Sequence, residues 1–588
     1  MIRICALAAF ALSIALPAAA SADLSTVAER SGFQRTGRYQ EVIELCEKFA
    51  AAYPQAVRCF AFGTTPQGRP MQAMAISTSG ALTAQAAHAR NLPVLLIQGG
   101  IHAGEIDGKD AGFHTLRRML DGQTARGALD AAVVVFVPVF NVDGHENFRA
   151  WNRPNQRGPE EMGFRTTAQR YNLNRDYIKA DAPEMQAMLG LVNEWDPIVT
   201  MDLHATDGAQ FQHDISVIGE PVYAGDAQLR GTGRGIRDGL IARLRKAGSD
   251  PVDFYPSFQT SDDPATGFAQ GVAPPRFSHG YFVQRNRIGI LIETHSWKDY
   301  PTRVRITGNT ISALTEMAAR DGKRWLADAE KADAASARLA GQTIALTYQA
   351  TQAARTIDFK GYVYTRTPSE ISGALMTRYD ESRPQVWRVP LRDEVVPDLQ
   401  VTLPLAGYVV PPEYAAVVEP KLRAHGLAYR ELAAPLAIDD AEVFRPESAQ
   451  FAAQSSEGRQ RVALTGTWQR QPARTAARAL YVPIAQPKAR IVAHLLEPQA
   501  PDSLAAWGEF NNAFEQKEYM EDYVAEDVAQ EMLARDAALK AQFEQRVKTD
   551  AAFAKDAAAR LDFFYRRHPA YDGDYMRYPV IRVDREPR

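Results

Sequence analysis

The feature that most constrains the fold is an alternation of continuously apolar runs with helical patterns between residues 57 and 331. A run such as Val133–Phe140 has no polar face, so it fits a strand that is covered on both sides. Because helical segments separate the runs, the sequence predicts an α/β domain with a mixed, largely parallel central sheet and helices on both faces. The expected strands are Val57–Phe62, Met71–Ile76, Pro93–Gln98, Val133–Phe140, Pro197–Leu203 and Arg287–Glu293, and the expected helices include Tyr39–Ala51, Gly108–Leu120, Pro183–Trp195, Gly235–Ala247 and Ser312–Lys331.

The chain changes character beyond residue 335. Residues 343–497 contain short strands punctuated by proline, a pattern that indicates a β-rich accessory domain. Residues 501–588 are charged and mostly helical in pattern. The sequence therefore divides into an α/β domain at 23–335, a β-rich region at 343–497 and a helical C-terminal region at 501–588.

Residues 1–22 have the three parts of a signal peptide. Arg3 supplies a positive charge, Ile4–Leu16 is apolar, and Ala20-Ser21-Ala22 fits a cleavage site that would leave Asp23 as the first mature residue. The apolar stretch is too short to span a bilayer, so cleavage is favoured over an uncleaved anchor. We expect export to the periplasm or the medium.

Composition excludes two broad classes of protein. Of 588 residues, 67 are Lys or Arg and 70 are Asp or Glu, so a net charge of −3 gives no positive field to attract nucleic acid. No segment after the leader approaches 18 consecutive apolar residues, so no membrane span is expected in the mature chain. The sequence leaves the oligomeric state open.

Two cysteines, Cys46 and Cys59, remain after removal of the leader. They stand 13 positions apart in a chain that we expect to be exported, and an oxidising compartment permits a disulfide between them. A pair of reduced, buried cysteines is the alternative.

Polar residues gather at the ends of the apolar runs. His102 and Glu105 follow one predicted strand, His204 follows another, and Glu293 ends a third. In open α/β sheets, ligands bind at the carboxyl ends of strands. Two His and one Glu form the ligand set of a catalytic zinc whose fourth position is left for water, and Glu293 could act as the general base. The predicted chemistry is metal-assisted hydrolysis of an acyl bond.

Spacing alone would not identify this site, because His494 and Glu497 have the same H-x-x-E spacing in an isolated apolar segment. We interpret that second copy as structural.

The ordered motifs between about residues 35 and 320 resemble the zinc carboxypeptidases, the metallocarboxypeptidases related to the pancreatic digestive enzymes. They are Gly63–Pro70 (G-x-T-x-x-G-R-P), His102-Ala-Gly-Glu105, Asn141-Val-Asp-Gly144, Leu173-Asn174-Arg175, Pro183-Glu184, the strand that ends in His204, and Glu293 on a late apolar strand. The resemblance implies that His102, Glu105 and His204 bind one Zn²⁺ per chain and that Glu293 is the catalytic acid/base. It also implies that Asn174 and Arg175 hold the terminal carboxylate of the substrate, a task that suits the planar guanidinium.

Three features of the family pattern are harder to place. Arg153, which follows Asn152 as in the family's Asn-Arg pair, is the favoured residue for polarising the scissile carbonyl, with Arg157 in reserve. The tyrosine that caps the substrate in the family cannot be placed by spacing, and Tyr281 is our candidate. The residue that sets side-chain preference lies between His204 and Glu293 in the family, where this chain does not align.

The sequence therefore predicts an exported zinc metallocarboxypeptidase that hydrolyses C-terminal peptide bonds with a zinc-activated water and Glu293 as general base. The alternative is a zinc amidohydrolase or deacylase on the same scaffold, acting on a small N-acyl amino acid or a cell-wall peptide.

Overall fold

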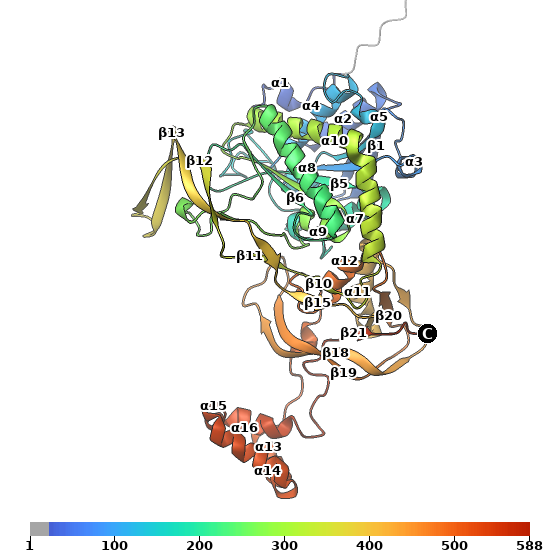
Figure 1. Ribbon diagram of the computed structural model, residues 1–588, viewed down its shortest axis with the longest axis vertical. Coiled ribbons are helices and arrows are strands. Elements are labelled where there is room, and N and C mark those ends of the chain that lie inside the picture. Colours follow the sequence, from blue (N-terminus) through green and yellow to red (C-terminus); the bar gives the residue numbers. More distant parts are fainter. Residues whose placement is uncertain (1–22) are drawn as a thin grey trace, which may run out of the picture.

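The computed structural model describes residues 23–588 (Figure 1). The predicted signal peptide, residues 1–22, lies outside the described residues. Among the residues that are described, no helix is both long and apolar enough to cross a membrane.

An eight-stranded mixed sheet forms the centre of the N-terminal half, which confirms the predicted fold class. Four neighbouring strands, β4-β3-β5-β9, run parallel, and antiparallel strands flank them. The strand order is β1 (Val57–Thr64), β2 (Pro70–Ile76), β4 (Val133–Val137), β3 (Val94–Gly99), β5 (Val199–Ala205), β9 (Ile288–Thr294), β6 (Ile215–Glu220) and β7 (Pro251–Val252).

Helices cover both faces of this sheet. Leu203 of β5 faces helix α4, because a side chain added at Gly108 of α4 would meet Leu203. Gly289 of β9 lies against His279 of helix α9. Leu203 is paired with Ile292, and strand side chains alternate, so Gly289 and Leu203 point to opposite faces. The helices of this half are α1 (Val27–Arg30), α2 (Tyr39–Ala52), α3 (Ala84–Ala89), α4 (Asp107–Leu120), α5 (Ala128–Ala131), α6 (Val142–Glu146), α7 (Pro183–Trp195), α8 (Ala227–Lys246), α9 (Ser278–Gln284) and α10 (Tyr300–Ser336), with 3₁₀ turns η1 (Leu173–Arg175) and η2 (Pro264–Thr266).

A disulfide fixes the N-terminal edge of the sheet. Cys46 of α2 and Cys59 of β1 are bonded, with their Cα atoms 5.4 Å apart.

The C-terminal half contributes a long hairpin and a second sheet. Strands β12 (Arg355–Pro368) and β13 (Leu375–Arg392) form the hairpin, and β13 also pairs with the short strand β8 (Phe268–Ala269) of the N-terminal half. Two small two-stranded sheets pair the segments before and after the hairpin: β10 (Thr343–Ala345) pairs with β15 (Gln400–Thr402), and β11 (Tyr348–Ala350) pairs with β14 (Val395–Pro397). The six-stranded antiparallel sheet has the order β17 (Arg430–Glu431), β20 (Leu480–Pro483), β16 (Gly407–Val410), β21 (Ile581–Val583), β18 (Leu436–Phe451) and β19 (Val462–Thr475), accompanied by helices α11 (Pro412–Ala424) and α12 (Ala489–Leu496).

The last helices form a small body of their own, which projects from the rest in Figure 1. They bury a separate apolar cluster that includes Phe553 and Phe563. The chain then returns to the six-stranded sheet as β21, so the region 501–588 is not helical to its end. The helices of this body are α13 (Asp522–Arg535), α14 (Ala537–Thr549), α15 (Ala551–Lys555) and α16 (Ala557–Tyr565), whereas the preceding turn η3 (Asn511–Phe514) packs in the main core.

The two halves share one apolar core rather than touching at a polar seam. The largest core cluster runs from Leu24 through the central sheet to Tyr408, Val482 and Val580 of the second sheet. Ion pairs add to the junction: the buried carboxylate of Asp181 in the N-terminal half binds Lys421 Nζ at 2.6 Å and Arg459 Nη2 at 2.9 Å. The C-terminal half is therefore packed against the first half through a shared core and is not merely joined to it by a linker.

Candidate active site

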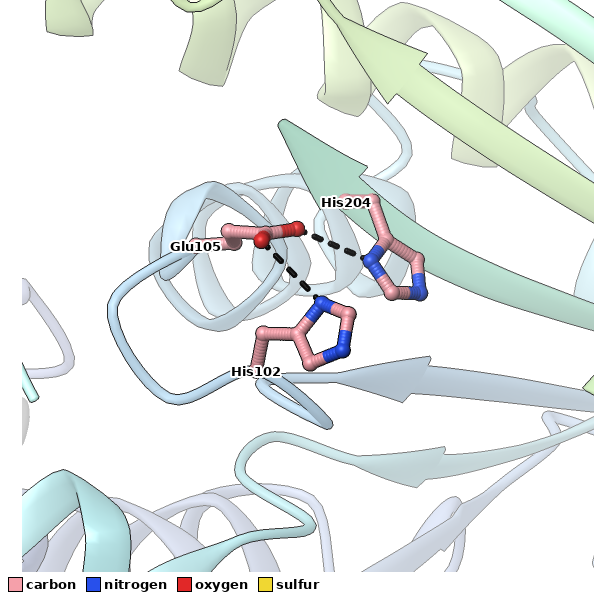
Figure 2. A group of neighbouring side chains, drawn as sticks. All are labelled: His102, Glu105 and His204. Atoms are coloured by element: carbon pink, nitrogen blue, oxygen red, sulfur yellow. Dashed lines mark hydrogen bonds and ion pairs between the residues drawn. The ribbon is translucent and has the colours of Figure 1, made fainter. Parts of the chain in front are cut away.

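Three potential metal ligands meet at the carboxyl end of the sheet (Figure 2). His102 and Glu105 lie in the loop after β3, and His204 lies near the end of the adjacent strand β5. One ligand atom from each residue lies within 4.8 Å of the other two. His102 Nδ1 is 3.1 Å from Glu105 Oε1, and His204 Nδ1 is 2.8 Å from Glu105 Oε2. The structure thus brings together all three residues that the sequence predicted as ligands.

Glycines shape the loop that presents the first two ligands. Gly100 has φ +61°, a conformation that side chains disfavour, and a Cβ at Gly99 would lie 2.6 Å from the Pro138 carbonyl oxygen. Gly104 lies against Arg153, where a Cβ would come within 2.6 Å of its side chain. The chain can therefore turn directly from β3 and return Glu105 toward His102.

The far side of each imidazole is also held. His102 Nε2 lies 3.1 Å from Asn172 Oδ1, and His204 Nε2 lies 2.9 Å from Asp202 Oδ2. Asp202 in turn accepts hydrogen bonds from Ser278 Oγ at 2.6 Å and Gln98 Nε2 at 2.8 Å. Such outer partners fix ring orientation in metal sites. Both Nδ1 atoms are consequently left facing the same point.

The donor set fits a zinc ion. His102 Nδ1 lies 3.1 Å from Glu105 Oε1 but makes no well-aligned hydrogen bond to it, so its lone pair can bind a metal ion. Burial lowers the pKa of His102 to about 4, so its ring is neutral at physiological pH, as a ligand must be. Burial acts to raise the pKa of Glu105, but Arg153 and His102 outweigh it and hold that pKa well below its usual range. Two imidazoles and one carboxylate are the protein ligands of many catalytic zinc sites.

Glu293 stands beside this group. It lies on β9, in register with His204 on β5, and both side chains are buried. Its Oε2 atom has no hydrogen-bond partner. Burial raises the pKa of Glu293 to about 8, opposed by the neighbouring His204. A carboxyl group with a raised pKa can both accept and return a proton near neutrality.

A cavity of about 460 Å³ opens from these residues. His102 and Glu293 line one part of it, and Asn174 and Arg175 line the same space. Arg175 donates one hydrogen bond, at 2.8 Å, to the neighbouring Asn174 carbonyl, and its guanidinium lies 4.3 Å over the Phe277 ring. The adjacent Asp176 pairs instead with Lys179 at 2.5 Å. Arg175 therefore has guanidinium donors left for a bound anion.

Three arginines of the loop between α6 and η1, Arg153, Arg157 and Arg165, have different positions. Arg153 is buried, with Nη1 2.9 Å from Glu105 Oε1 and Nη2 3.3 Å from the carbonyls of Ala205 and Thr206, so it braces a ligand and does not line the cavity. Arg157 lies at the surface and pairs with Glu381 at 2.6 Å. Arg165, which the sequence analysis did not consider, lines the cavity with its Nη1 3.3 Å from Glu105 Oε1. No local pattern distinguished Arg165 from its neighbours.

The structure also places Tyr281, the predicted capping tyrosine, away from the cavity. Tyr281 is fully buried on α9, and its hydroxyl lies 2.8 Å from His425 Nδ1, so it does not reach the cavity. Tyr255 does line the cavity and is 41 % exposed. The charge of Glu293 raises the pKa of Tyr255, so its hydroxyl stays protonated. Tyr255 lies in an irregular loop, where no periodicity marks it.

The outer wall of the cavity depends on the C-terminal hairpin. Phe254 and Phe268 pack in one cluster with Phe359 and Trp387 of β12 and β13. The loop that follows Tyr255 is fastened to the hairpin, because Thr377 N donates to Asp262 Oδ2 at 2.8 Å and Arg366 pairs with Asp263 at 2.5 Å. Residues from both halves therefore shape the substrate side of the site.

Comparison with known proteins agrees with the motifs. Residues 42–216 match the family model of the zinc carboxypeptidases, which confirms the resemblance over that range. The match includes His102, Glu105, Arg175 and His204 and ends before Glu293. A comparison with curated proteins finds no match.

Solved structures that resemble part of the chain include carboxypeptidases. Carboxypeptidase A from Helicoverpa armigera is 15 % identical, with a TM-score of 0.36 over 50 % of this chain and 75 % of that one. A metallo-carboxypeptidase from Pseudomonas aeruginosa is 16 % identical, with a TM-score of 0.35 over 48 % and 69 %. A metallo-carboxypeptidase from Burkholderia cenocepacia is 16 % identical, with a TM-score of 0.33 over 46 % and 68 %.

Proposed function

We propose that this protein is an exported zinc metallocarboxypeptidase that removes residues from the C-termini of peptides. The observation that carries the proposal is a single cavity lined by His102 of the His–Glu–His group, by Glu293 and by Arg175. A carboxylate bound by Arg175 would place the preceding peptide bond toward Glu293.

His102, Glu105 and His204 would hold the zinc ion. When bound, zinc supplies a Lewis acid that polarises a carbonyl oxygen and makes water more acidic. The chain supplies the other parts. Asn172 and Asp202 keep the imidazoles in place, and Arg153 holds the Glu105 carboxylate through an ion pair.

Glu293 moves the proton in this mechanism. Its free oxygen would accept a proton from the attacking water and then deliver it to the leaving amine. Arg165 lies in the cavity beside Glu105, where its guanidinium would stabilise the negative charge on the carbonyl oxygen. Tyr255, at the exposed edge of the cavity, would cover the bound peptide.

Two features support export. The leader pattern of residues 1–22 ends in Ala20-Ser21-Ala22, a short sequence typical of a cleavage site. The Cys46–Cys59 disulfide is a bond that persists in oxidising compartments. Cell fractionation followed by N-terminal sequencing tests this part: Asp23 at the N-terminus of protein outside the cytoplasm is expected, and a cytoplasmic chain that retains Met1 would contradict it.

The activity is tested with purified protein that begins at Asp23. It is incubated with a mixed pool of peptides, with and without a chelator, and the products are followed by mass spectrometry. We expect ladders that lose single C-terminal residues and that the chelator abolishes. A protein that holds zinc and shortens no peptide, but splits an N-acyl amino acid or a cell-wall peptide, would instead be the amidohydrolase.

A further inference from the structure

The cavity extends beyond the reacting residues to a charged end, where Arg237 packs against Gly219 of β6. Gly219 pairs with Ile290, three residues before Glu293 on β9. The inner walls of the cavity are mostly apolar, and two opposite charges, Arg237 of α8 and Asp253 after β7, line the same space. If Arg175 holds the terminal carboxylate, this extension is where the side chain of the last substrate residue would lie. The apolar lining includes Ile218, Val222, Phe254, Val272 and Leu291.

Arg237 and Asp253 face each other without making a close ion pair. Arg237 Nη1 is 3.8 Å from Asp253 Oδ2, beyond hydrogen-bond distance. The one side-chain hydrogen bond of Arg237 within residues 23–588 runs from Nε to Asp238 Oδ1, at 2.9 Å. Among the described residues, the Asp253 carboxylate accepts one hydrogen bond, from Gln270 Nε2 at 3.4 Å. Both groups therefore keep unused hydrogen-bonding capacity although the Arg237 side chain is only 12 % exposed.

The other polar groups at this end are already engaged. Gln270 accepts a hydrogen bond from the Tyr223 hydroxyl through its side chain, and its backbone N–H donates to the Arg392 carbonyl of the hairpin at 2.8 Å. The Glu220 carboxyl accepts from Val222 N at 2.7 Å. The capacity that remains for a ligand belongs chiefly to Arg237 and Asp253.

A side chain with one charge would suit this end poorly. An ammonium placed against Asp253 would lie close to the Arg237 guanidinium, and a carboxylate placed against Arg237 would lie close to Asp253. Like charges brought together in a partly buried site are strongly unfavourable. A side chain whose terminal group is neutral overall, with a hydrogen-bond donor and an acceptor side by side, can bind Asp253 and Arg237 at once.

We infer that this extension selects C-terminal residues whose long side chain ends in such a paired donor and acceptor. The inference rests on the proposed carboxypeptidase function. Two sources share this chemistry. One is the carboxamide of glutamine, and the other is a side chain that ends in an ammonium and a carboxylate on the same carbon, as in diaminopimelate.

The test compares five peptides that differ only in the last residue: glutamine, diaminopimelate, lysine, glutamate and leucine. Hydrolysis is measured with the wild-type protein, and binding of the same peptides is measured by calorimetry with Glu293→Gln. We expect glutamine or diaminopimelate to exceed lysine, glutamate and leucine by about tenfold or more in kcat/KM and in affinity. The ranking of these two residues identifies the source.

Two charge-removing variants sharpen the test. Arg237→Gln leaves Asp253 alone and should shift preference toward lysine, whereas Asp253→Asn leaves Arg237 alone and should shift it toward glutamate. Arg243→Gln, on a more exposed face of the same helix, is the matched control and should leave the ranking unchanged. Loss of folding would lower all five peptides together and would not produce opposite shifts.

The outcomes separate this inference from the proposed function. Hydrolysis with no dependence on the last side chain, a wild-type preference for lysine, glutamate or leucine, or binding of none of the peptides would overturn the inference. Binding in the expected order without any hydrolysis would support the inference and refute the carboxypeptidase proposal.

Discussion

The two ends of the cavity are built in different ways. At the metal end, the candidate ligands and Glu293 lie on or directly after β3, β5 and β9, neighbouring strands of one buried sheet. At the substrate end, Asp253, Tyr255 and Gln270 lie in short or irregular segments that the distant hairpin β12–β13 holds in place. The strands at the metal end belong to the central core, whereas the wall at the substrate end depends on contacts between the two halves. We therefore expect metal binding to be insensitive to the hairpin and substrate use to depend on it.

The largest effect is expected from His204→Ala. This change removes one of three ligands, so the purified variant should lose its zinc and its hydrolytic activity together. Metal analysis and peptide hydrolysis measure the two results. His568→Ala, in the helical C-terminal region, serves as the control. Normal zinc content in His204→Ala would remove that residue from the ligand set.

Glu293→Gln should separate metal binding from turnover. Its amide cannot accept the proton, so kcat should fall by about 10³-fold while zinc content stays unchanged. Turnover close to that of the wild type would exclude Glu293 as the general base. Glu316→Gln, on the exposed side of α10, should have no effect on either quantity.

Arg366→Gln tests the contribution of the hairpin. The change removes the ion pair with Asp263 and should loosen the loop that carries Tyr255, so kcat/KM should fall by about tenfold while zinc content is preserved. Arg388→Gln, on the same hairpin but exposed, is the matched control. A changed metal content would show that the metal end also depends on the hairpin, and unchanged kinetic constants would show that the substrate end does not.

Asp181→Asn should weaken the junction between the two halves without touching the site. The carboxylate is buried among Lys179, Lys421 and Arg459, and removing one partner of a buried ionic group costs about 3 kcal/mol of unfolding free energy. Denaturant titration measures this loss, and Glu419→Gln, at an exposed pair, should leave stability unchanged.

The same carboxylate predicts a pH dependence. Burial acts to raise the pKa of Asp181, but Arg459 and Lys179 outweigh it and lower that pKa to about 2. A folded-state pKa below the unfolded value of 3.8 stabilises the protein above pH 3.8, and this stabilisation is lost as the pH falls from 3.8 toward 2. The stability difference between wild type and Asp181→Asn should therefore shrink in acid. A difference that stays constant down to pH 2 would contradict this explanation.

The metal end was predictable because its residues are tied to regular elements. Continuous apolar runs indicate buried strands, and the residues that follow neighbouring parallel strands must meet at one edge of the sheet. Context was essential: the second H-x-x-E, His494 and Glu497, is buried in the C-terminal half, where Glu497 pairs with Arg582 at 2.6 Å. The H-x-x-E spacing alone, without the position after a strand, would have predicted a metal site at both copies equally.

The substrate end was not predictable for the converse reason. Arg165 and Tyr255 lie in segments without periodicity, and only their tertiary position distinguishes them from Arg153 and Tyr281. Strand β8 has two residues, too few for a pattern, and it is held by a hairpin more than a hundred residues further along the chain. Helix limits were also approximate: the segment predicted as Ser312–Lys331 is part of the longer helix α10, which begins after the Asp299 N-cap.

The central claim is that the metal group and the carboxylate-binding Arg175 act on the same substrate in one cavity. The most direct measurement uses one peptide in two forms, with a free and with an amidated C-terminus, each incubated with and without a chelator. We predict that the free acid loses its last residue, that the amide is left intact, and that the chelator stops the reaction. Equal cleavage of both forms, or cleavage that the chelator does not affect, would contradict it.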